Sequence, residues 1–187
     1  MLVVMGLAGA GKTSILNGVL KRKPKIDIIN YGDIAFDIAL KKKIVKNRDE
    51  ILSIPISNHL ELQDKVVSKL EDKGKTILDT HAVLRRSPSG FIAGLHPPIF
   101  EKFKFEGFVF IDADTNEIIK RKKADTTRTT RSMISKEKID EDRFLSKLFI
   151  SNYATRTGSP IYFIINKQNR LNDSINEFIK IIEFLGW

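Results

Sequence analysis

The chain has 187 residues, 42% of them hydrophobic, and carries a formal net charge of +9. This length fits one folded unit, so we expect a single domain over residues 1–187, and the hydrophobic content excludes a disordered chain. No apolar run approaches the roughly 18 residues that cross a membrane. Cysteine is absent, which excludes disulfides and thiolate metal sites. The chain also opens on a strand-like stretch in place of a secretory leader, so we expect a cytoplasmic protein.

Short apolar runs alternate with helical patterns along the chain. Because five such runs are separated by helices, the pattern predicts an α/β fold, with a parallel sheet covered by helices on both faces. Asp114 and Glu117 have the spacing of a helix cap. Strands are expected at 2–5, 26–30, 75–79, 107–111 and 160–165, and helices at 12–22, 33–43, 58–73, 114–123, 138–155 and 171–185.

Ligands of such open sheets bind beyond the carboxyl ends of the strands. Two long connections are therefore candidate substrate loops, because long irregular segments in a compact domain are often functional. Residues 80–98 are rich in Gly, Pro and Arg, and residues 124–137 are rich in Thr, Arg and Ser.

The connection between the first expected strand and helix matches the P-loop pattern G-x-x-x-x-G-K-[ST]. Its glycines let successive backbone N–H groups point at phosphate oxygens, and the positive end of the following helix adds to that field. Lys12 would bridge the β- and γ-phosphates of ATP, and the Thr13 hydroxyl would ligate Mg²⁺. The predicted ATP site is Gly6, Leu7, Ala8, Gly9, Ala10, Gly11, Lys12, Thr13 and Ser14.

A second acidic element ends the third expected strand, at Asp79. In P-loop proteins an Asp at this place holds Mg²⁺, usually through water. The alternative is an Asp that merely caps the next loop. Asp112 and Asp114 also follow a strand, but helix capping explains them fully.

Arginines in the two long connections favour a kinase over a GTPase or a mechanical ATPase. Phosphoryl transfer between two polyanions needs positive charge on both donor and acceptor, and arginine supplies a permanent charge with a bidentate fork. No general base is needed when the acceptor is itself a phosphate. His81 lies near Asp79, where it could orient substrate or be structural. The arginines concerned are Arg85, Arg86, Arg121, Arg128 and Arg131.

The chain resembles the archaeal-type adenylate kinases. The resemblance rests on Ile-Asn-Tyr-Gly-Asp at 29–33, Asp-Thr-His-Ala-Val at 79–83, Ser-Pro-Ser-Gly-Phe at 87–91 and Asp-Thr-Thr-Arg at 125–128, in the family's order. It implies a three-layer α/β/α P-loop fold with a five-stranded parallel sheet and a short lid without zinc. It also implies reversible conversion of ATP and AMP into two ADP with Mg²⁺, by a homotrimer. The AMP-binding region would span about 30–60 and the lid about 122–140.

The resemblance also assigns roles to individual residues. Arg128 would be the lid arginine near the donor nucleotide, and Arg121 matches the basic position leading into the lid. Arg85 would meet the acceptor phosphate. The AMP site would include Asn30, Tyr31, Gly32, His81 and Arg85, and the catalytic set would be Lys12, Arg85, Arg121 and Arg128.

The chain departs from the family pattern at several positions. The segment with Arg85 and Arg86 is one residue longer than usual, which leaves the choice between these two arginines open. The spacing between Arg128 and Arg131 is also longer, so no role is assigned to Arg131. Leu52 and Lys147 stand where the family often has arginine.

Two other functions remain open at this point. A kinase for a different nucleoside monophosphate would keep the P-loop and differ only around the acceptor. An RNA- or ribosome-associated ATPase of similar fold would explain the net charge. Against this second alternative, the sequence shows no aromatic and basic stacking pattern and no known nucleic-acid module.

Overall fold

The computed structural model describes residues 1–86, 90–124 and 135–187. Five parallel strands form the central sheet in the order β2-β3-β1-β6-β7. All five expected strands and the parallel sheet are therefore confirmed. Their bounds are Leu2–Gly6 for β1, Asp27–Asn30 for β2, Thr76–Asp79 for β3, Gly107–Asp112 for β6 and Ile161–Ile165 for β7.

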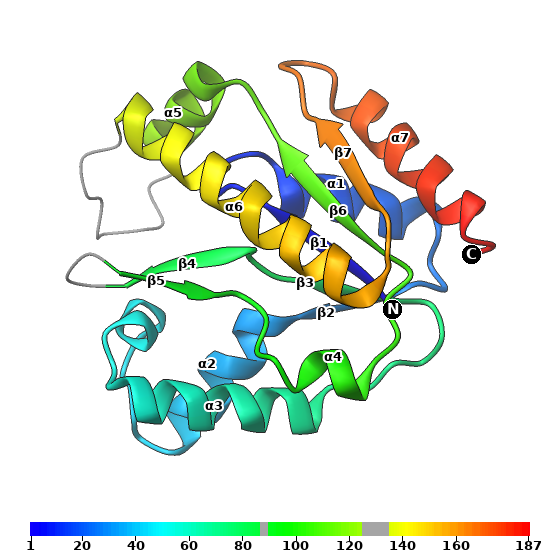
Figure 1. Ribbon diagram of the computed structural model, residues 1–187. Coiled ribbons are helices and arrows are strands. Elements are labelled where there is room, and N and C mark those ends of the chain that lie inside the picture. The colour runs from blue at the N-terminus through cyan, green and yellow to red at the C-terminus, as the bar shows by residue number, and fades with distance from the viewer. Residues whose placement is uncertain (87–89, 125–134) are drawn as a thin grey trace.

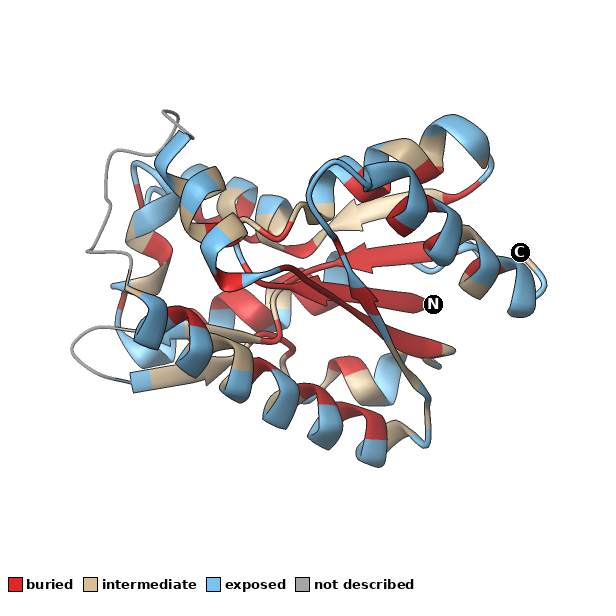
Figure 2. Cartoon of the chain, turned by 90° about the horizontal axis from the view of Figure 1, so that it is seen from above, coloured by how far each residue is buried: buried red, intermediate tan, exposed pale blue. Residues whose placement is uncertain are grey.

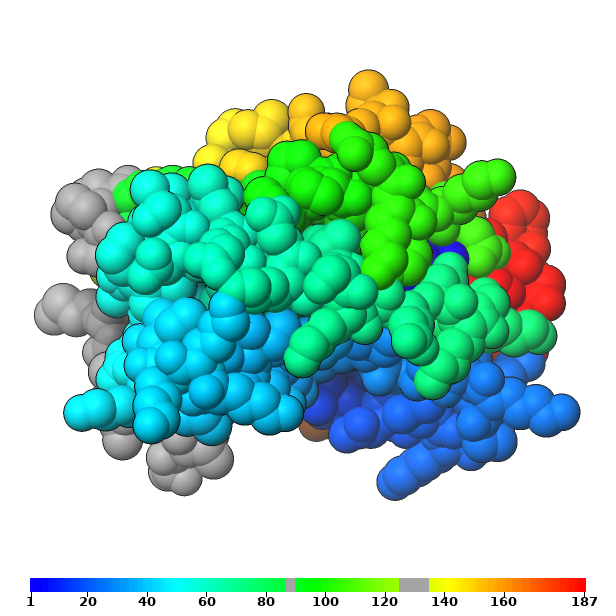
Figure 3. Space-filling view, turned by 90° about the horizontal axis from the view of Figure 1, so that it is seen from below, coloured from blue at the N-terminus to red at the C-terminus, as the bar shows by residue number. Residues whose placement is uncertain are grey.

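Helices cover both faces of this sheet (Figure 1). α6 crosses one face, whereas α1 and α7 pack against each other on the other face. The segment from α2 to α4 gathers beside β2 and β3 and forms one side of the molecule, which Figure 3 shows from below. The helices are α1 Lys12–Arg22, α2 Tyr31–Lys41, the 3₁₀ helix η1 Arg48–Leu52, α3 Ile56–Lys69, α4 Ile99–Lys102, α5 Thr115–Ala124, α6 Lys136–Thr157 and α7 Leu171–Phe184.

The core lies on the three inner strands of the sheet, β3, β1 and β6, as the burial colours in Figure 2 show. Every residue of β1 and β6 is buried, including Phe108 and Phe110. Strands covered on both faces have nearly continuous apolar sequences, and β1 and β6 have such sequences. Burial of a Phe side chain contributes about 1.5–3 kcal/mol, so these two strands anchor the sheet.

The connection 80–98 is not irregular throughout, which corrects the sequence prediction. Val83–Arg86 (β4) and Gly90–Ala93 (β5) form an antiparallel pair. The buried hydroxyl of Tyr153 in α6 fixes its base: it donates to the Ala82 carbonyl at 2.8 Å and accepts from the Gly94 N–H at 3.1 Å. These strands have only four residues each and contain Gly and two Arg, so the sequence carries no clear strand pattern here.

The register of the sheet brings three chain segments together at its carboxyl edge. Asp79 at the end of β3 lies beside Asn30 at the end of β2 and beside Val4 of β1. α2 begins at Tyr31, two residues before the expected start, because the Asn30 side chain caps it by accepting from the Asp33 N–H at 3.0 Å. The end of β1 leads directly into the P-loop, so the predicted phosphate and metal residues meet here.

Candidate functional site

The P-loop joins the buried end of β1 to α1. Gly9 and Gly11 have φ of 91° and 92°, a backbone region that favours glycine. A Cβ added at Gly11 would also overlap the amide nitrogen of Asn166. The first turn of α1 has no side-chain cap, so its N–H groups are available to an anion at the positive end of the helix.

The outer side of the P-loop is held by two side chains from distant segments. Asn166, just after β7, donates from Nδ2 to the Ala10 carbonyl at 2.8 Å. Arg121 of α5 donates to the same carbonyl at 3.2 Å and to the Asn166 carbonyl at 3.4 Å. These bonds hold the Ala10 carbonyl, and the Ala10 N–H donates to the Leu7 carbonyl at 3.0 Å, so the conformation of the loop is fixed by its own backbone and by two side chains from outside it.

Lys12 and Asp79 form an ion pair in which both side chains are nearly buried. Asn30 donates from Nδ2 to the second carboxylate oxygen of Asp79 at 2.8 Å. The structure thus brings together three of the residues that the sequence assigned separately to ATP, AMP and the metal.

The environment of Lys12 lowers its pKa to about 8 from the ordinary value of 10.5. Burial is the largest cause, because it penalises the charged form. The positive charge of Arg48 lowers the pKa further, whereas Asp33 raises it. Arg48 and Asp33 therefore act electrostatically on the P-loop lysine.

The donor set at this edge fits a magnesium ion held partly by a nucleotide. Thr13 is exposed in the first turn of α1, and Asp79 offers a carboxylate at the end of β3. Both supply oxygen, the ligand that Mg²⁺ prefers. Within the described ranges, no group of three or more His, Asp or Glu side chains could hold a metal ion.

The side of the site beyond β2 is lined by exposed charges. Arg48 in η1 pairs with Asp33 of α2 and donates to the Asn30 side-chain oxygen at 3.3 Å. A Cβ at Gly32 would overlap the end of the Arg48 side chain, so the guanidinium lies directly against the backbone of Gly32. Asn30 thus connects Arg48 to Asp79: its side-chain oxygen accepts from Arg48, and its Nδ2 donates to the Asp79 carboxylate.

The side chain of Tyr31 does not face this surface. It is 5% exposed, and its hydroxyl donates to Gln63 of α3. Gln63 Nε2 lies 2.8 Å from His59 Nε2, so a buried polar chain ties α2 to α3. Burial raises the pKa of Tyr31 and lowers that of His59, so both stay neutral near pH 7.

Arg85 and Arg86 point to different neighbours. Arg85 contacts α6, where it pairs with Glu141 and with Asp142 at 2.7 Å. Arg86 donates from Nη2 to the Ile54 carbonyl at 2.5 Å, before α3. Its Nη1 is buried and has no hydrogen-bond partner in the part of the chain that the structure describes.

The remaining predicted residues lie as follows. His81 is partly buried two residues beyond Asp79. Arg128 and Arg131 lie outside the described residues. Asp112 accepts from Arg143 of α6 at 2.7 Å and from the Ala113 N–H at 2.8 Å, so it caps no helix, and the capping predicted for it is wrong. Asp114 accepts from the N–H groups of Asn116 and Glu117 at the start of α5.

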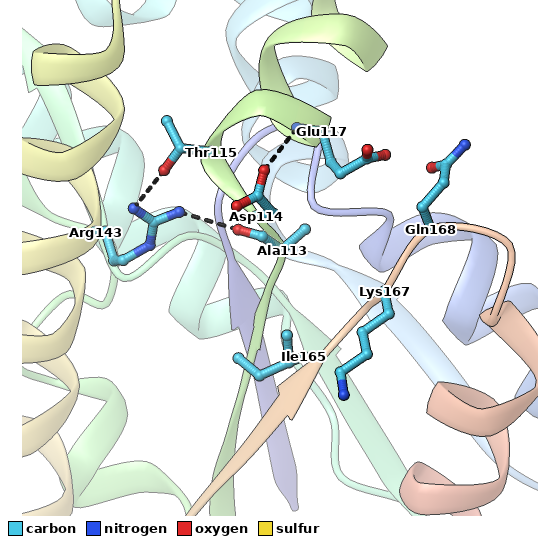
Figure 4. Close-up of a pocket in the computed structure, with 8 residues that line it drawn as sticks. All are labelled: Ala113, Asp114, Thr115, Glu117, Arg143, Ile165, Lys167 and Gln168. Carbon is cyan, nitrogen blue, oxygen red and sulfur yellow. Dashed lines mark hydrogen bonds between the residues drawn. The ribbon is translucent and has the colours of Figure 1, made fainter.

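A pocket of about 480 Å³ opens at the carboxyl ends of β6 and β7 (Figure 4). None of its lining residues belongs to the P-loop or to the region around Asp79, so this pocket is separate from the Lys12–Asp79 cluster. It lies beside the connection that carries Asn166. The lining residues are Ala113, Asp114, Thr115, Glu117, Arg143, Ile165, Lys167 and Gln168.

Sequence reasoning missed two residues of this site. Asn166 follows the fifth strand, and the rule that polar residues at carboxyl ends of strands are site candidates could have found it. Arg48 gave no such signal, because it lies in a 3₁₀ helix whose distance from β2 only the fold determines.

Comparison with known proteins gives one consistent result. Residues 5–140 match the protein family described as an AAA domain. The chain is 30% identical to an adenylate kinase of Methanothermobacter thermautotrophicus over 186 residues, which cover 98% of this chain and 99% of that one. It is 31% identical to an adenylate kinase of Pyrococcus horikoshii, over 98% and 95% of the two chains.

A solved structure shares the fold. The shikimate kinase of Bacteroides thetaiotaomicron superposes with a TM-score of 0.59 over 97% of each chain, at 12% sequence identity. At this identity the likeness concerns the architecture alone, which is a P-loop kinase fold.

Proposed function

The chain belongs to the adenylate kinase family of the archaea, and we propose that it performs the reversible transfer of a phosphoryl group from Mg-ATP to AMP at the carboxyl edge of its sheet. The observation that carries this proposal is the cluster of Lys12, Asp79 and Asn30 beside an uncapped P-loop helix. The cluster joins the phosphate-binding residues to the segment predicted to hold AMP.

On the donor side, the residues from Gly6 to Ser14 would bind the ATP phosphates. Their N–H groups and the positive end of α1 favour negative charge. Lys12 would exchange its partner Asp79 for the β- and γ-phosphates, because phosphate oxygens carry more negative charge than one carboxylate. Arg121 keeps the loop in shape through its bond to the Ala10 carbonyl.

When bound, Mg²⁺ would neutralise charge on the β- and γ-phosphates. Thr13 and Asp79 would hold it, with Asp79 acting partly through water. The release of Asp79 from Lys12 on ATP binding supplies the carboxylate for this role.

On the acceptor side, AMP would lie between α2, η1 and the hairpin β4–β5. Arg85 would meet its phosphate after leaving Glu141 and Asp142, and Arg48 would add a second charge after leaving Asp33. Asn30 and Gly32 would line the site. Since the Tyr31 side chain is buried against Gln63, its contact with AMP would come through its backbone.

The acceptor phosphate attacks as an anion, so the protein needs to position and neutralise rather than remove a proton. Arg128 would complete the charge neutralisation from the lid, on the resemblance alone. His81 would orient the acceptor. A lid over about 122–140 would keep water from accepting the phosphoryl group.

Domain organisation, location and assembly belong to the same proposal. We propose one domain with an AMP-binding region at about 30–60. A cytoplasmic location and a homotrimer stay predictions from the sequence. Among the described residues, no helix is both long and apolar enough to span a bilayer. The alternative of an RNA-associated ATPase lacks support from the relatives, which are adenylate kinases over nearly their whole length.

An acceptor screen tests the proposal. Purified protein with Mg-ATP is given AMP, GMP, CMP, UMP or no acceptor, and ADP is followed over time. We expect ADP formation that requires AMP, runs backward from ADP alone and stops when EDTA removes Mg²⁺. ATP loss without any acceptor, or turnover with another monophosphate in place of AMP, would contradict the proposal.

A further inference from the structure

Arg85, the arginine assigned to the acceptor phosphate, already holds two negative charges in this structure. Its Nε donates to Asp142 Oδ1 at 2.7 Å, and its Nη2 donates to Glu141 Oε2 at 2.5 Å. Both acidic residues belong to α6, which lies beside β4 (Figure 1). We call Glu141 and Asp142 the α6 carboxylates.

The two bonds use one side of the guanidinium group. Nε and Nη2 are neighbours on this planar group, and each of them meets an oxygen of a different carboxylate. A phosphate binds an arginine in the same way, with two of its oxygens on two neighbouring N–H groups. The α6 carboxylates therefore occupy the places that two oxygens of an acceptor phosphate would take.

The charge of the α6 carboxylates also matches that of an acceptor phosphate. Together they carry two negative charges, and a phosphate monoester carries about −1.5 to −2 at pH 7. Arg85 has one positive charge, so it cannot neutralise both groups at the same time. Negative groups at this separation repel each other. A phosphate and the α6 carboxylates therefore exclude each other from Arg85.

Arg85 does not depend on the α6 carboxylates for its position. Its guanidinium carbon lies 4.8 Å from the centre of the Phe91 ring, and Phe91 is the residue opposite Arg85 in the pairing of β4 with β5. An aromatic ring attracts a cation placed over its face. The Tyr153 hydroxyl fixes the base of the same hairpin. Arg85 thus keeps its place when the α6 carboxylates leave it.

The next residue, Arg86, shows that the competition is specific to one of the two arginines. Successive side chains of a strand point to opposite faces, so Arg86 turns away from α6. It donates to the Ile54 carbonyl, and this partner in the described part of the chain is neutral. Of these two arginines, only Arg85 is held by carboxylates.

We propose that the α6 carboxylates are an internal competitor of the acceptor phosphate, and that they weaken AMP binding by holding Arg85 in the empty site. This inference rests on the proposed function, because it takes Arg85 as the partner of the AMP phosphate. AMP binds by displacing Glu141 and Asp142 from Arg85, and both return when the nucleotide leaves. They are positioning residues, since they act through Arg85 and do not touch AMP.

Neutral variants of the α6 carboxylates test the proposal. The double variant Glu141→Gln with Asp142→Asn keeps the shape of both side chains and removes both charges. The KM for AMP should fall about 3- to 10-fold, as expected when exposed ion pairs no longer compete, and the KM for ATP should stay unchanged. Glu137→Gln is the matched control, because Glu137 is an exposed carboxylate one turn earlier on α6. It should change neither KM.

The same double variant in an Arg85→Ala background separates competition from a general change of charge. Without Arg85 the α6 carboxylates have no arginine to hold. The KM for AMP should then be the same with Glu141 and Asp142 as with their neutral replacements. A fall of the KM in this background as well would contradict action through Arg85.

Two further results overturn the proposal. If the unaltered enzyme turns over AMP and the double variant does not lower the KM for AMP, the competition is wrong and the proposed function stands. If the unaltered enzyme does not use AMP at all, the proposed function and this inference fall together. The side chains of Glu141 and Asp142 are 51% and 31% exposed, so their neutral variants should fold. If circular dichroism shows that the double variant is unfolded, Asp142→Asn alone decides, with an expected fall of about 2- to 3-fold.

Discussion

The donor and acceptor halves of the proposed site are built in opposite ways. On the donor side, Lys12 and Asp79 are nearly buried, and Asn166 holds the P-loop from the connection after β7. On the acceptor side, Arg48 and Arg85 are about half exposed and are neutralised by acidic side chains of other segments. One half is a preformed cradle, and the other is a set of charges paired with one another.

This difference follows from what each half must do. The P-loop presents backbone N–H groups. Because β1 and α1 hold the loop on both sides, these groups can be neither screened nor moved unless those two elements refold. Exposed ion pairs are weak, about 0–1 kcal/mol, so a phosphate can replace the acidic partners of Arg48 and Arg85 easily. The acceptor half can therefore rearrange around AMP while the donor half stays in place.

The largest effect expected is the loss of turnover in Lys12→Ala. Removing one preorganised charge that stabilises the transition state costs on the order of 10³-fold in kcat. The fold should persist, because Asn30 still donates to Asp79. Turnover and thermal unfolding are measured together, with Lys21→Ala on the exposed side of the same helix as control. A variant that keeps most of its turnover would remove Lys12 from the donor half.

Gly11→Ala tests whether the cradle is rigid. The added Cβ would overlap Asn166 and force a positive φ on alanine, so we expect roughly 100-fold weaker ATP binding from a misplaced loop. Gly74→Ala is the matched control, because Gly74 has φ 99° with no atom within 4 Å of its added Cβ. The control should lose about 1 kcal/mol of unfolding free energy and no ATP affinity. Equal ATP affinity in both variants would show that the cradle is not rigid.

Arg85→Ala and Arg86→Ala separate the two arginines of the acceptor half. We expect Arg85→Ala to raise the KM for AMP roughly 10- to 100-fold, with the KM for ATP little changed. Arg86→Ala should instead lower the free energy of unfolding, because Arg86 ties β4 to the Ile54 carbonyl. Steady-state kinetics measures the KM values, and urea denaturation measures the free energy of unfolding. The reverse pattern would assign the acceptor phosphate to Arg86, whose Nη1 is unpartnered among the described residues.

Arg48→Ala should also raise the KM for AMP, by a smaller factor than Arg85→Ala does. We expect about a tenfold higher KM for AMP, since Arg48 is half exposed and its charge is screened. Arg22→Ala is the control, because Arg22 is also an exposed arginine that bonds to uncharged side chains. An unchanged KM for AMP would leave Arg48 as a purely structural partner of Asp33.

The pH dependence should link the two halves. Lys12 binds phosphate only when protonated, so kcat/KM for ATP should fall about tenfold per pH unit as the pH rises above about 8. Arg48→Gln should move this midpoint upward, since the Arg48 charge lowers the pKa of Lys12.

The unfolded chain holds the Lys12 proton up to its ordinary pKa of 10.5, so this group makes the free energy of unfolding rise between about pH 8 and 10.5. A value of kcat/KM for ATP that stays constant from pH 7 to 9 would contradict the link between Lys12 and Arg48.

The sequence predicted the donor half better than the acceptor half for the same physical reason. A P-loop is local: its glycines, Lys12 and Thr13 are adjacent in the chain, and the strand before them is strongly apolar. Asp79 could be placed because parallel strands end at one edge. Arg48 and the hairpin β4–β5 depend on contacts between distant segments, such as Tyr153 with Ala82, which no local pattern records.

Binding of a molecule that joins two adenosines through a chain of five phosphates tests the central claim most directly, namely that the two halves form one site for both nucleotides. Calorimetry should find one molecule per chain, bound far more tightly than ATP or AMP alone. The affinity should fall in Lys12→Ala and also in Arg85→Ala, because each removes charge from one half. Binding no tighter than that of ATP, or affinity that depends on Lys12 and not on Arg85, would contradict a shared site.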